Sequence, residues 1–444
     1  MPNILVIGGG AREQAIVNTL MRSPQKPTIF CCASNTNPGI VHWVKEYWLG
    51  NICEVDVIAK IASRWQIDLA IVGPEAPLEK GMADALWQYN IPTIGPKKIL
   101  AQLESSKSFT RNLLQRHQIA GSPEYRVFAN GDVLTAAKQF LQQLGEGNYV
   151  VKADGLMSGK GVKVAGDHLA SLEEAYQFCE ELYSHGSAFV IEEKLIGQEF
   201  SLLCFCDGTT LVSMPLVQDH KRAFVDDEGP NTGGMGSYSD ANHSLPFLTS
   251  EDIQAAQAIN KAVMKALTKE HPEKFIGILY GSFMATKEGV RLIEYNARFG
   301  DPEAMNVLAI LETDLLTIFQ AMVNGNLSAK LVRFANLATV CKYIVPIGYP
   351  DQPQKNFLID VTQIENPQQL YFSGVDLRDE KLYATGSRAV AVVGIAQSIF
   401  AAEEMAEKEV GRVIGALIHR PDIGTKKLVN KRIKIMRELR QCVN

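Results

Sequence analysis

The sequence predicts a multidomain fold of the α/β and α+β classes from three observations. The chain has 444 residues, enough for roughly two to four domains of ~100–200 residues each. Near the N-terminus, short apolar strands alternate with helical segments, which is typical of a parallel sheet with ligands at the carboxyl ends of its strands. Farther along, strands flank glycine-rich loops and short strands return near the C-terminus, which indicates mixed α+β domains.

Four parts are expected along the chain. Residues 1–103 form an N-terminal parallel α/β domain, and residues 104–325 form a central domain that contains a subdomain at about 121–190. Residues 326–425 form a small C-terminal α+β domain. The basic tail, 426–444, is expected to be a solvated amphipathic helix, with an interaction role as the alternative.

Apolar periodicity and end signals place the elements in order. A long helix is expected over 250–269, begun by Ser250 with two acidic residues in its first turn. One helix is expected from the region of Glu303 to about Val323, and another over 400–419. Expected strands lie at 4–7, 28–32, 69–72, 92–94, 125–128, 149–152, 162–165, 188–192, 200–206, 211–215, 276–285, 290–294, 338–345, 369–371 and 388–395.

Composition and charge exclude several classes of protein. Hydrophobic residues make up 46% and charged residues 21%, which is globular composition and excludes a disordered chain, a collagen-like repeat or a coiled coil. No run of ~18 apolar residues predicts a membrane span, and a net charge of -5 gives no reason to expect nucleic-acid binding. The eight cysteines form no CxxC motif and no secretory pattern opens the chain, so we expect a cytoplasmic protein without a disulfide scaffold or zinc site.

The first glycine-rich loop, at residues 8–10, follows the first strand. Gly8 and Gly10 fit a dinucleotide-binding G-x-G-x-x-G motif, but Glu13 stands at the third glycine position and opposes close helix–strand packing. A nicotinamide site, and with it a dehydrogenase, is therefore disfavoured. The tight turn into a helix favours a single phosphate, with a plain structural turn as the alternative.

The second loop, 154–161, lies between two strands. Its G-x-x-x-G-K-G spacing differs from that of a P-loop, and a strand follows it where a P-loop needs a helix. A loop of this kind can fold over a triphosphate as a flap, with backbone N–H groups, Lys160 and Lys152 neutralising the charge. A structural hairpin is the alternative.

The third loop, 229–236, has four glycines in eight residues, which allows the backbone to approach a ligand closely. It follows the polar cluster QDHKR at 218–222, for which a solvated charge run is the alternative. His220 by itself is more often a surface or core histidine than a catalyst.

A metal site is expected at the end of the strand 290–294. Glu294 and Asn296 lie two residues apart, so an extended strand places both side chains on one face. A carboxylate and an amide oxygen suit Mg²⁺, which keeps water and nucleotide phosphates as its other ligands. Arg298 can hold a carboxylate or acyl phosphate with two hydrogen bonds, oriented by Asp301 and Glu303. An ordinary strand end with a surface salt bridge is the alternative.

Together these segments carry a family resemblance that spans about residues 1–425. The segments KADGLMSGKGV at 152–162, QDHKR at 218–222, GPNTGGMGSY at 229–238 and EYNARFGDPE at 294–303 resemble the phosphoribosylamine–glycine ligase family of the ATP-grasp superfamily. GGGARE, VGPEAPL, SSKSF and RPDIG also match, in the same order along the chain. The resemblance implies an ATP-grasp fold. It also implies a ligase of purine biosynthesis that joins glycine to 5-phosphoribosylamine through glycyl phosphate, with ATP and Mg²⁺ or Mn²⁺.

The resemblance also assigns roles to residues. It places Glu294 and Asn296 on the metal, and we assign glycine and the acyl phosphate to Arg298, Asp219, Lys221 and Arg222. The implied ATP-binding residues are Lys107, Lys152, Gly155, Gly159, Lys160, Gly161, Glu192, Glu193, Leu195 and Glu199. The implied substrate-binding residues are Gly9, Gly10, Glu13, Pro74, Glu75, Pro77, Asn231, Gly233, Gly234 and Asp301.

Some positions depart from the family pattern. Gln14 replaces a usual histidine, Ser387 replaces a usual glycine before Arg388, and Ser282 and Met284 offer no carboxylate for a second metal ion. Two alternatives remain open, namely another ATP-grasp enzyme of purine synthesis and a non-catalytic nucleotide-binding regulator. We expect a monomer that binds neither nucleic acid nor membrane.

Overall fold

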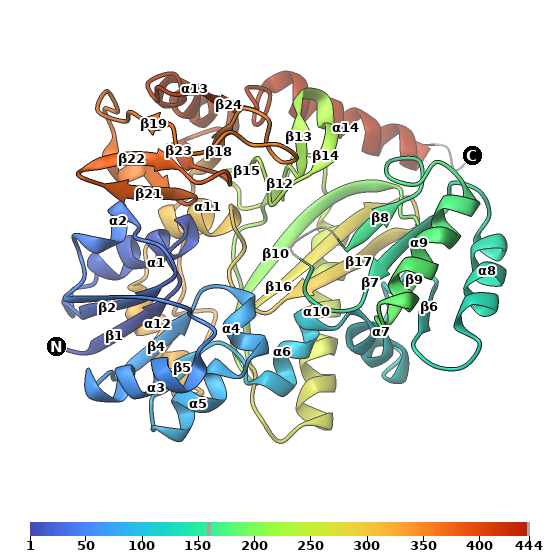
Figure 1. Cartoon of the computed structure of the whole chain (residues 1–444), viewed down its shortest axis with the longest axis horizontal. Helices are drawn as coiled ribbons and strands as arrows, with labels where there is room; N and C mark the ends of the chain where they lie inside the picture. The colour runs from blue at the N-terminus through green and yellow to red at the C-terminus, as the bar shows by residue number, and fades with distance from the viewer. Residues whose placement is uncertain (158–160, 442–444) are drawn as a thin grey trace.

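The computed structural model describes residues 1–157 and 161–441. The N-terminal domain lies at one end of the molecule, a small subdomain lies at the other, and a central sheet lies between them, with the C-terminal strands above (Figure 1). This arrangement confirms the predicted multidomain α/β and α+β fold. Within the described residues, no helix combines the length and apolar character that a membrane crossing needs.

The N-terminal domain is a five-stranded parallel sheet in the order β3-β2-β1-β4-β5, with helices on both faces. Its apolar strands are buried, as the near-continuous runs of hydrophobic residues predict. The strands are β1 Asn3–Ile7, β2 Thr28–Ala33, β3 Glu46–Leu49, β4 Leu69–Val72 and β5 Thr93–Ile94. The helices are α1 Ala11–Met21, α2 Pro38–Val41, α3 Val55–Arg64, α4 Glu75–Glu79, α5 Met82–Gln88, α6 Lys98–Ser105 and α7 Lys107–Arg116, the last two leading into the central domain.

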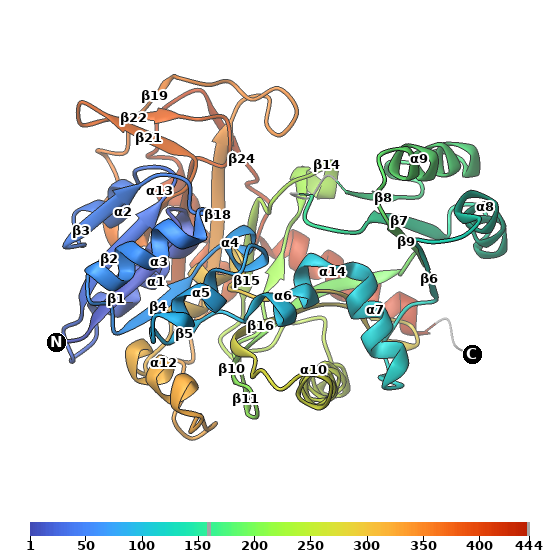
Figure 2. The same cartoon turned by 60° about the horizontal axis from the view of Figure 1, so that its bottom comes forward.

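The subdomain at the opposite end, which we call the flap subdomain, is an antiparallel sheet in the order β6-β9-β7-β8 covered by two helices (Figure 2). Its apolar residues form a hydrophobic cluster of their own, separate from the main core. The elements are β6 Tyr125–Phe128, α8 Val133–Leu144, β7 Tyr149–Ala153, β8 Val162–Val164, α9 Leu172–Ser184 and β9 Phe189–Glu193. Polar contacts must therefore fix much of its position on the central sheet.

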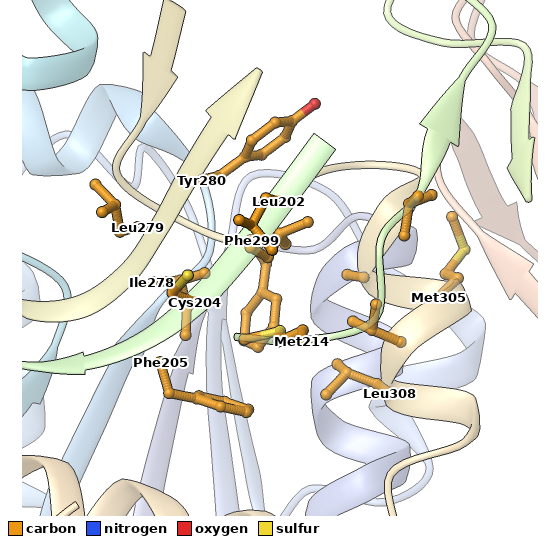
Figure 3. Close-up of a cluster of buried hydrophobic side chains, with 14 of the residues drawn as sticks. Leu202, Cys204, Phe205, Met214, Ile278, Leu279, Tyr280, Phe299, Met305 and Leu308 are labelled. Carbon is orange, nitrogen blue, oxygen red and sulfur yellow. The ribbon is translucent and has the colours of Figure 1, made fainter. Parts of the chain in front are cut away.

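The central sheet, β11-β10-β16-β17, carries the main hydrophobic core. Figure 3 shows side chains of β10 and β16 packed with Phe299 and with Met305 and Leu308 of the helix that follows. The elements are β10 Gly197–Asp207, β11 Leu211–Ser213, α10 Ser250–Glu270, β16 Ile276–Thr286, β17 Gly289–Asn296, α11 Glu303–Ala309 and α12 Leu315–Asn324.

The C-terminal sheet crosses the predicted domain boundary at 325. Its order is β12-β15-β18-β23-β20, so β15 from the central part of the chain pairs with β18, which follows residue 325, and β12 joins the sheet by pairing with β15. The elements are β12 Gln218–Asp219, β13 Arg222–Phe224, β14 Glu228–Asn231, β15 Gly236–Ser239, β18 Ala338–Pro346, β19 Leu358–Ile359, β20 Leu370–Phe372, β21 Val375–Arg378, β22 Lys381–Ala384, β23 Val390–Ala396, α13 Ile399–Val410 and β24 Leu417–His419.

Helix α10 begins at Ser250 with Glu251 and Asp252 in its first turn, as predicted, and the preceding Thr249 caps it: its hydroxyl accepts from the Asp252 N–H while Asp252 accepts from the Thr249 N–H. Two other helix predictions were wrong in detail. The helix predicted from Glu303 to Val323 is two helices, since Asp314 caps a new one. The segment predicted as a helix over 400–419 ends its helix at Val410, and its last residues form strand β24, paired with β18.

The tail was also predicted wrongly as a solvated helix. Helix α14 (Lys426–Gln441) buries Leu428, Val429 and Met436 and packs against β10 and β16. Its Arg440 pairs with Asp252 of α10 at 2.7 Å. Helix α14 is therefore part of the packed molecule.

Candidate active site

A cavity of about 560 Å³ lies where the N-terminal domain, the flap subdomain, the central sheet and the C-terminal strands meet. Most of the predicted site residues line it, which means that the fold brings together motifs far apart in sequence. They are Glu75, Lys107, Lys152, Gly155, Gly161, Glu192, Glu193, Leu195, Glu199, Asp219, Lys221, Arg222, Asn231, Gly233, Glu294, Asn296, Arg298 and Asp301. The predicted residues Gly159 and Lys160 lie outside the described residues.

A buried ion cluster holds the flap subdomain to the central domain. Arg111 of α7 donates two hydrogen bonds to the carboxylate of Glu192, at 2.6 and 2.9 Å, and the Lys152 Nζ lies 2.7 Å from the same carboxylate. Arg111 also donates to the carbonyl of Leu292 on β17, at 3.0 Å. Burial acts to raise the pKa of Glu192, but Arg111 and Lys152 together lower it to about 2. The Glu192 side chain is therefore engaged with cations of the protein.

A second contact fixes the start of the flap loop to the N-terminus of α7. The carboxylate of Asp154 accepts from the Lys107 N–H at 2.6 Å and from the hydroxyl of Ser108. An acidic side chain at this end of a helix satisfies free N–H groups and the helix dipole. The Lys107 Nζ donates to the Gly155 carbonyl at 2.9 Å, so the segment SSKSF holds a lysine under the flap.

The predicted metal ligands lie among cations. Glu294 and Asn296 of β17 both line the cavity. Burial acts to raise the pKa of Glu294, but Lys221, Lys152 and Lys107 lower it, so this carboxylate stays ionised. Ser282 is the residue opposite Glu294 on β16, which places no carboxylate there. The oxygens of Glu294 and Asn296 fit one divalent cation that takes its other ligands from water or phosphate.

Arg298 joins the metal strand to the N-terminal domain. Its Nε lies 3.2 Å from Glu75, and its Nη2 lies 2.8 Å from Glu104. Burial raises the pKa of Glu104 to about 7 in spite of Arg298, whereas Arg298 and Arg12 outweigh burial at Glu75 and lower its pKa to about 2. The guanidinium is thus oriented by two carboxylates, as an anion-binding group at the cavity wall needs to be.

The predicted polar cluster at 218–222 also faces the cavity. The Lys221 Nζ lies 3.3 Å from Glu199, which raises the pKa of Lys221. Burial and the charge of Glu303 raise the pKa of Asp219 well above its usual range. Arg222 pairs with Asp167 of the flap subdomain, at 2.5 Å. The cluster therefore presents the charged Lys221 to the cavity beside Asp219, whose ionised form a positively charged ligand would stabilise.

The glycines of the third loop allow close backbone contacts. A Cβ atom at Gly234, whose φ is +109°, would lie 2.7 Å from an oxygen of Asp219. Arg388 of the C-terminal domain donates to the carbonyls of Gly233, at 2.7 Å, and Gly234, at 3.1 Å, and pairs with Asp301 at 3.3 Å. The serine at position 387, where the family pattern has glycine, therefore leaves Arg388 in contact with the third loop.

The predicted phosphate loops of the N-terminal domain meet each other. Glu13 accepts from the Gly10 N–H at 2.7 Å, and a Cβ atom at Gly73 would lie 2.0 Å from a Glu13 oxygen. The ring of Pro74 lies beside Gly8. Glu13 is thus buried because glycines make room for it, contrary to the expected conflict with helix–strand packing. Gly9, Gly10, Glu13, Pro74 and Pro77 are not in the cavity wall, and their substrate roles stay predictions.

Sequence reasoning missed Glu104, Arg111 and Arg388. Glu104 is a lone acidic residue on the otherwise apolar inner face of α6, and Arg111 is a buried arginine of α7. The sequence alone does not show that these charged side chains are buried beside the site. Gln14, the departure from histidine, bonds the backbone of Leu370 and Phe372 and so joins the N-terminal and C-terminal parts.

The flap subdomain over an antiparallel central sheet, with lysines beneath the flap and a metal-type donor pair on β17, defines an ATP-grasp protein. Comparison with known families agrees. The ATP-grasp domain of phosphoribosylglycinamide synthetase matches residues 105–304, its N domain matches 2–104 and its C domain matches 339–426. The chain belongs to the phosphoribosylglycinamide synthetase family, which confirms the resemblance.

Relatives cover nearly the whole chain. The phosphoribosylamine–glycine ligase of Methanosarcina barkeri is 46% identical over 437 residues, 98% of this chain and 99% of its own. That of Methanocaldococcus jannaschii is 46% identical over 447 residues, 99% of this chain and 100% of its own. The crystal structure of the Thermotoga maritima ligase has a TM-score of 0.80 at 23% identity, covering 95% of this chain and 100% of that chain, which shows the shared fold.

We predict that His220 makes the protein sensitive to acid. Burial, with Arg432 and Arg420 nearby, lowers the pKa of His220 to about 3. An unfolded histidine binds a proton below about pH 6.5, whereas folded His220 stays neutral, so the free energy of unfolding falls by about 1.4 kcal/mol per pH unit in that range. His220→Gln removes this loss, which denaturant titrations between about pH 7 and pH 5 measure.

The control is His185→Gln, at an exposed histidine of the flap subdomain. It is expected to follow the wild type at each pH. Equal pH dependence for wild type and His220→Gln would contradict the prediction.

Proposed function

We propose that the protein is an ATP-dependent ligase that joins glycine to 5-phosphoribosylamine, giving glycinamide ribonucleotide, ADP and phosphate in purine biosynthesis. The main support is that the segments that resemble one ligase family line one cavity, where basic and acidic side chains face each other. A glycine carboxylate oxygen attacks the γ-phosphorus of ATP and ADP leaves. The amine then attacks the carbonyl carbon of glycyl phosphate, and phosphate leaves.

ATP would lie between the flap subdomain and the central sheet. Lys107 and Lys152 are positioned to neutralise phosphates, and the Gly155 and Gly161 segments of the flap line the same space. Glu193, Leu195 and Glu199 line the cavity where the chain passes from β9 of the flap subdomain to β10 of the central sheet. They are proposed to bind the adenine and ribose, together with the backbone at Glu192. Burial under the flap would exclude water that hydrolyses an acyl phosphate.

Glu294 and Asn296 would hold Mg²⁺, or Mn²⁺, which neutralises phosphate charge when bound. The donor set of one ionised carboxylate and one amide oxygen fits either ion. The remaining chemistry falls to the side chains of the chain itself, which position the reactants and stabilise charge.

Glycine would lie between Arg298 and the Asp219 cluster. The oriented guanidinium of Arg298 suits the carboxylate and the acyl phosphate, and Lys221 and Arg222 add positive charge. The raised pKa of Asp219 shows a carboxylate whose charge lacks full compensation, and the ammonium group of glycine would supply it. Asn231, Gly233, Gly234 and Asp301 complete this side.

The sugar phosphate would bind at the loops that carry Gly9, Gly10 and Glu13 and Pro74, Glu75 and Pro77. Glu75 reaches the cavity and contacts Arg298, so this substrate would be adjacent to the acyl phosphate. We also propose a monomeric enzyme in the cytoplasm. The cysteines in the described part of the chain all carry free thiols, which supports a reducing compartment.

Oxygen transfer tests the reaction. With freshly generated phosphoribosylamine, glycine labelled with ¹⁸O in its carboxylate is expected to transfer one labelled oxygen to each phosphate released. ADP release that depends on both substrates is measured in the same reaction. Unlabelled phosphate would contradict the glycyl phosphate route, and ADP release driven by bicarbonate or formate in place of glycine would favour a different ATP-grasp enzyme.

Glu294→Ala is predicted to lower turnover by roughly 100-fold or more. The metal ion then loses its carboxylate ligand, and the charge of the phosphates is no longer neutralised. The measurement is ADP release as a function of Mg²⁺ concentration. The control is Glu288→Gln, at an exposed carboxylate in the turn before the same strand. Turnover near that of the wild type at limiting Mg²⁺ would contradict the metal assignment.

Arg298→Lys is predicted to raise the KM for glycine about tenfold and to lower turnover, because one ammonium group cannot bridge Glu75 and Glu104 and present two donors. Arg291→Lys, farther back on β17 and outside the cavity wall, is the control. Unchanged glycine kinetics in Arg298→Lys would remove Arg298 from substrate binding.

A further inference from the structure

The C-terminal helix α14 reaches the active site although it lies beyond the family's C domain, which ends at residue 426. Arg432, on this helix, lines the cavity. Only 13% of its side chain is exposed, whereas most other basic residues of α14 lie at the surface. The position raises the question of what this arginine does there.

Arg432 contacts the turn between β13 and β14. Its Nη2 lies 2.5 Å from an oxygen of Asp227, and Lys431 lies 3.5 Å from Asp226. Both aspartates have left-handed backbone conformations, with φ of 61° and 66°, which is uncommon for residues other than glycine. The turn therefore depends on side-chain contacts to keep its shape.

Arg420, from the RPDIG segment, holds the same turn from the other side. Its Nη1 donates to Asp227, at 3.0 Å, and to the backbone carbonyl of Arg222, at 3.1 Å. Asp422 accepts from the N–H of Asp226 at 3.0 Å. The turn is thus connected directly to Arg222, one of the residues proposed to bind glycine and the acyl phosphate.

Arg432 also lies near His220, the residue between Asp219 and Lys221. Among the described residues, neither ring nitrogen of His220 has a hydrogen-bond partner, nor does the Nε of Arg432, although all three atoms are buried. Buried polar groups without partners are uncommon and costly, so these two side chains depend on packing and on the Arg432–Asp227 pair to hold their places. Burial, with the charges of Arg432 and Arg420, keeps His220 neutral.

We propose that Arg432 is a positioning residue, which acts through Asp227 to hold the β13–β14 turn and thereby sets the place of Arg222 in the cavity. The helix α14 is then a functional part of the catalytic unit that anchors this arginine. The inference rests on the proposed function, because its readout is glycine kinetics.

The test compares Arg432→Gln and Arg432→Lys with two variants on the same helix. Arg437→Gln changes an exposed arginine, and Arg440→Gln removes the ion pair with Asp252, which loosens α14 without touching the turn. Arg432→Gln is expected to raise the KM for glycine about tenfold, with the KM for ATP nearly unchanged. Its melting temperature is expected to fall by no more than about 5 °C.

Arg432→Lys is expected to restore most of the glycine affinity, because an ammonium group can still pair with Asp227. Asp227→Asn is expected to give the same glycine defect, and the double variant is expected to be no worse than either single variant. Asp227→Asn also answers the question from the other partner if Arg432→Gln does not fold.

Two results would overturn the proposal. One is glycine kinetics in Arg432→Gln equal to those of Arg437→Gln. The other is a defect matched by Arg440→Gln and spread over all substrates in proportion to lost stability, which would show a structural role only. A wild-type protein without glycine-dependent ADP release would instead overturn the proposed function, and the two failures are therefore distinguishable.

Discussion

The buried carboxylate of Glu192 is the contact on which the geometry of the site depends. The flap subdomain has its own hydrophobic cluster, so apolar packing does not join it firmly to the central sheet. Glu192 and Lys152 belong to that subdomain, whereas Arg111 belongs to α7 and bonds the backbone of β17. Removing one member would leave the others as uncompensated buried charges, which is strongly unfavourable. The same interaction therefore places Lys152 in the cavity and attaches the flap subdomain.

Arg298 performs a comparable task between other parts of the chain. It follows the metal strand, yet its partners are Glu75 and Glu104 from the N-terminal part. Arg12, in the first turn of α1 after the first glycine-rich loop, donates to the carbonyl of Phe299, the residue that follows Arg298. Two arginines thus link the proposed sugar-phosphate loops to the proposed site of the acyl phosphate. A shift of either domain would change the positions of both substrates.

Most of the residues that the sequence predicted for the site line the cavity, because the patterns that predicted them are local. Glu294 and Asn296 share a face by strand periodicity alone, and the loop 154–161 was predicted as a flap from the strands on both of its sides. What sequence reasoning missed depends on long-range burial. Glu104 and Arg388 lie beside segments of the family pattern, but only the fold shows that their side chains contact Arg298 and Asp301. Local patterns also do not encode the pairing of β15 with β18, through which β15 and its neighbour β12 join the C-terminal sheet. The docking of α14 was missed because amphipathic periodicity shows that a helix has an apolar face but not what covers it.

The sharing of that sheet explains why the C-terminal domain matters for the chemistry. Asp219 lies on β12, which pairs with β15 and through it with β18. Arg388, Arg420 and Arg432 all come from the last part of the chain, and they hold the third glycine loop, the backbone of Arg222 and Asp227. Because the proposed glycine-binding segment lies between these arginines, its geometry is fixed only when the C-terminal part is in place. The same hydrophobic core contains residues of the central sheet and of β18 and β23, so the C-terminal strands and the central sheet form one packed unit around the proposed glycine site.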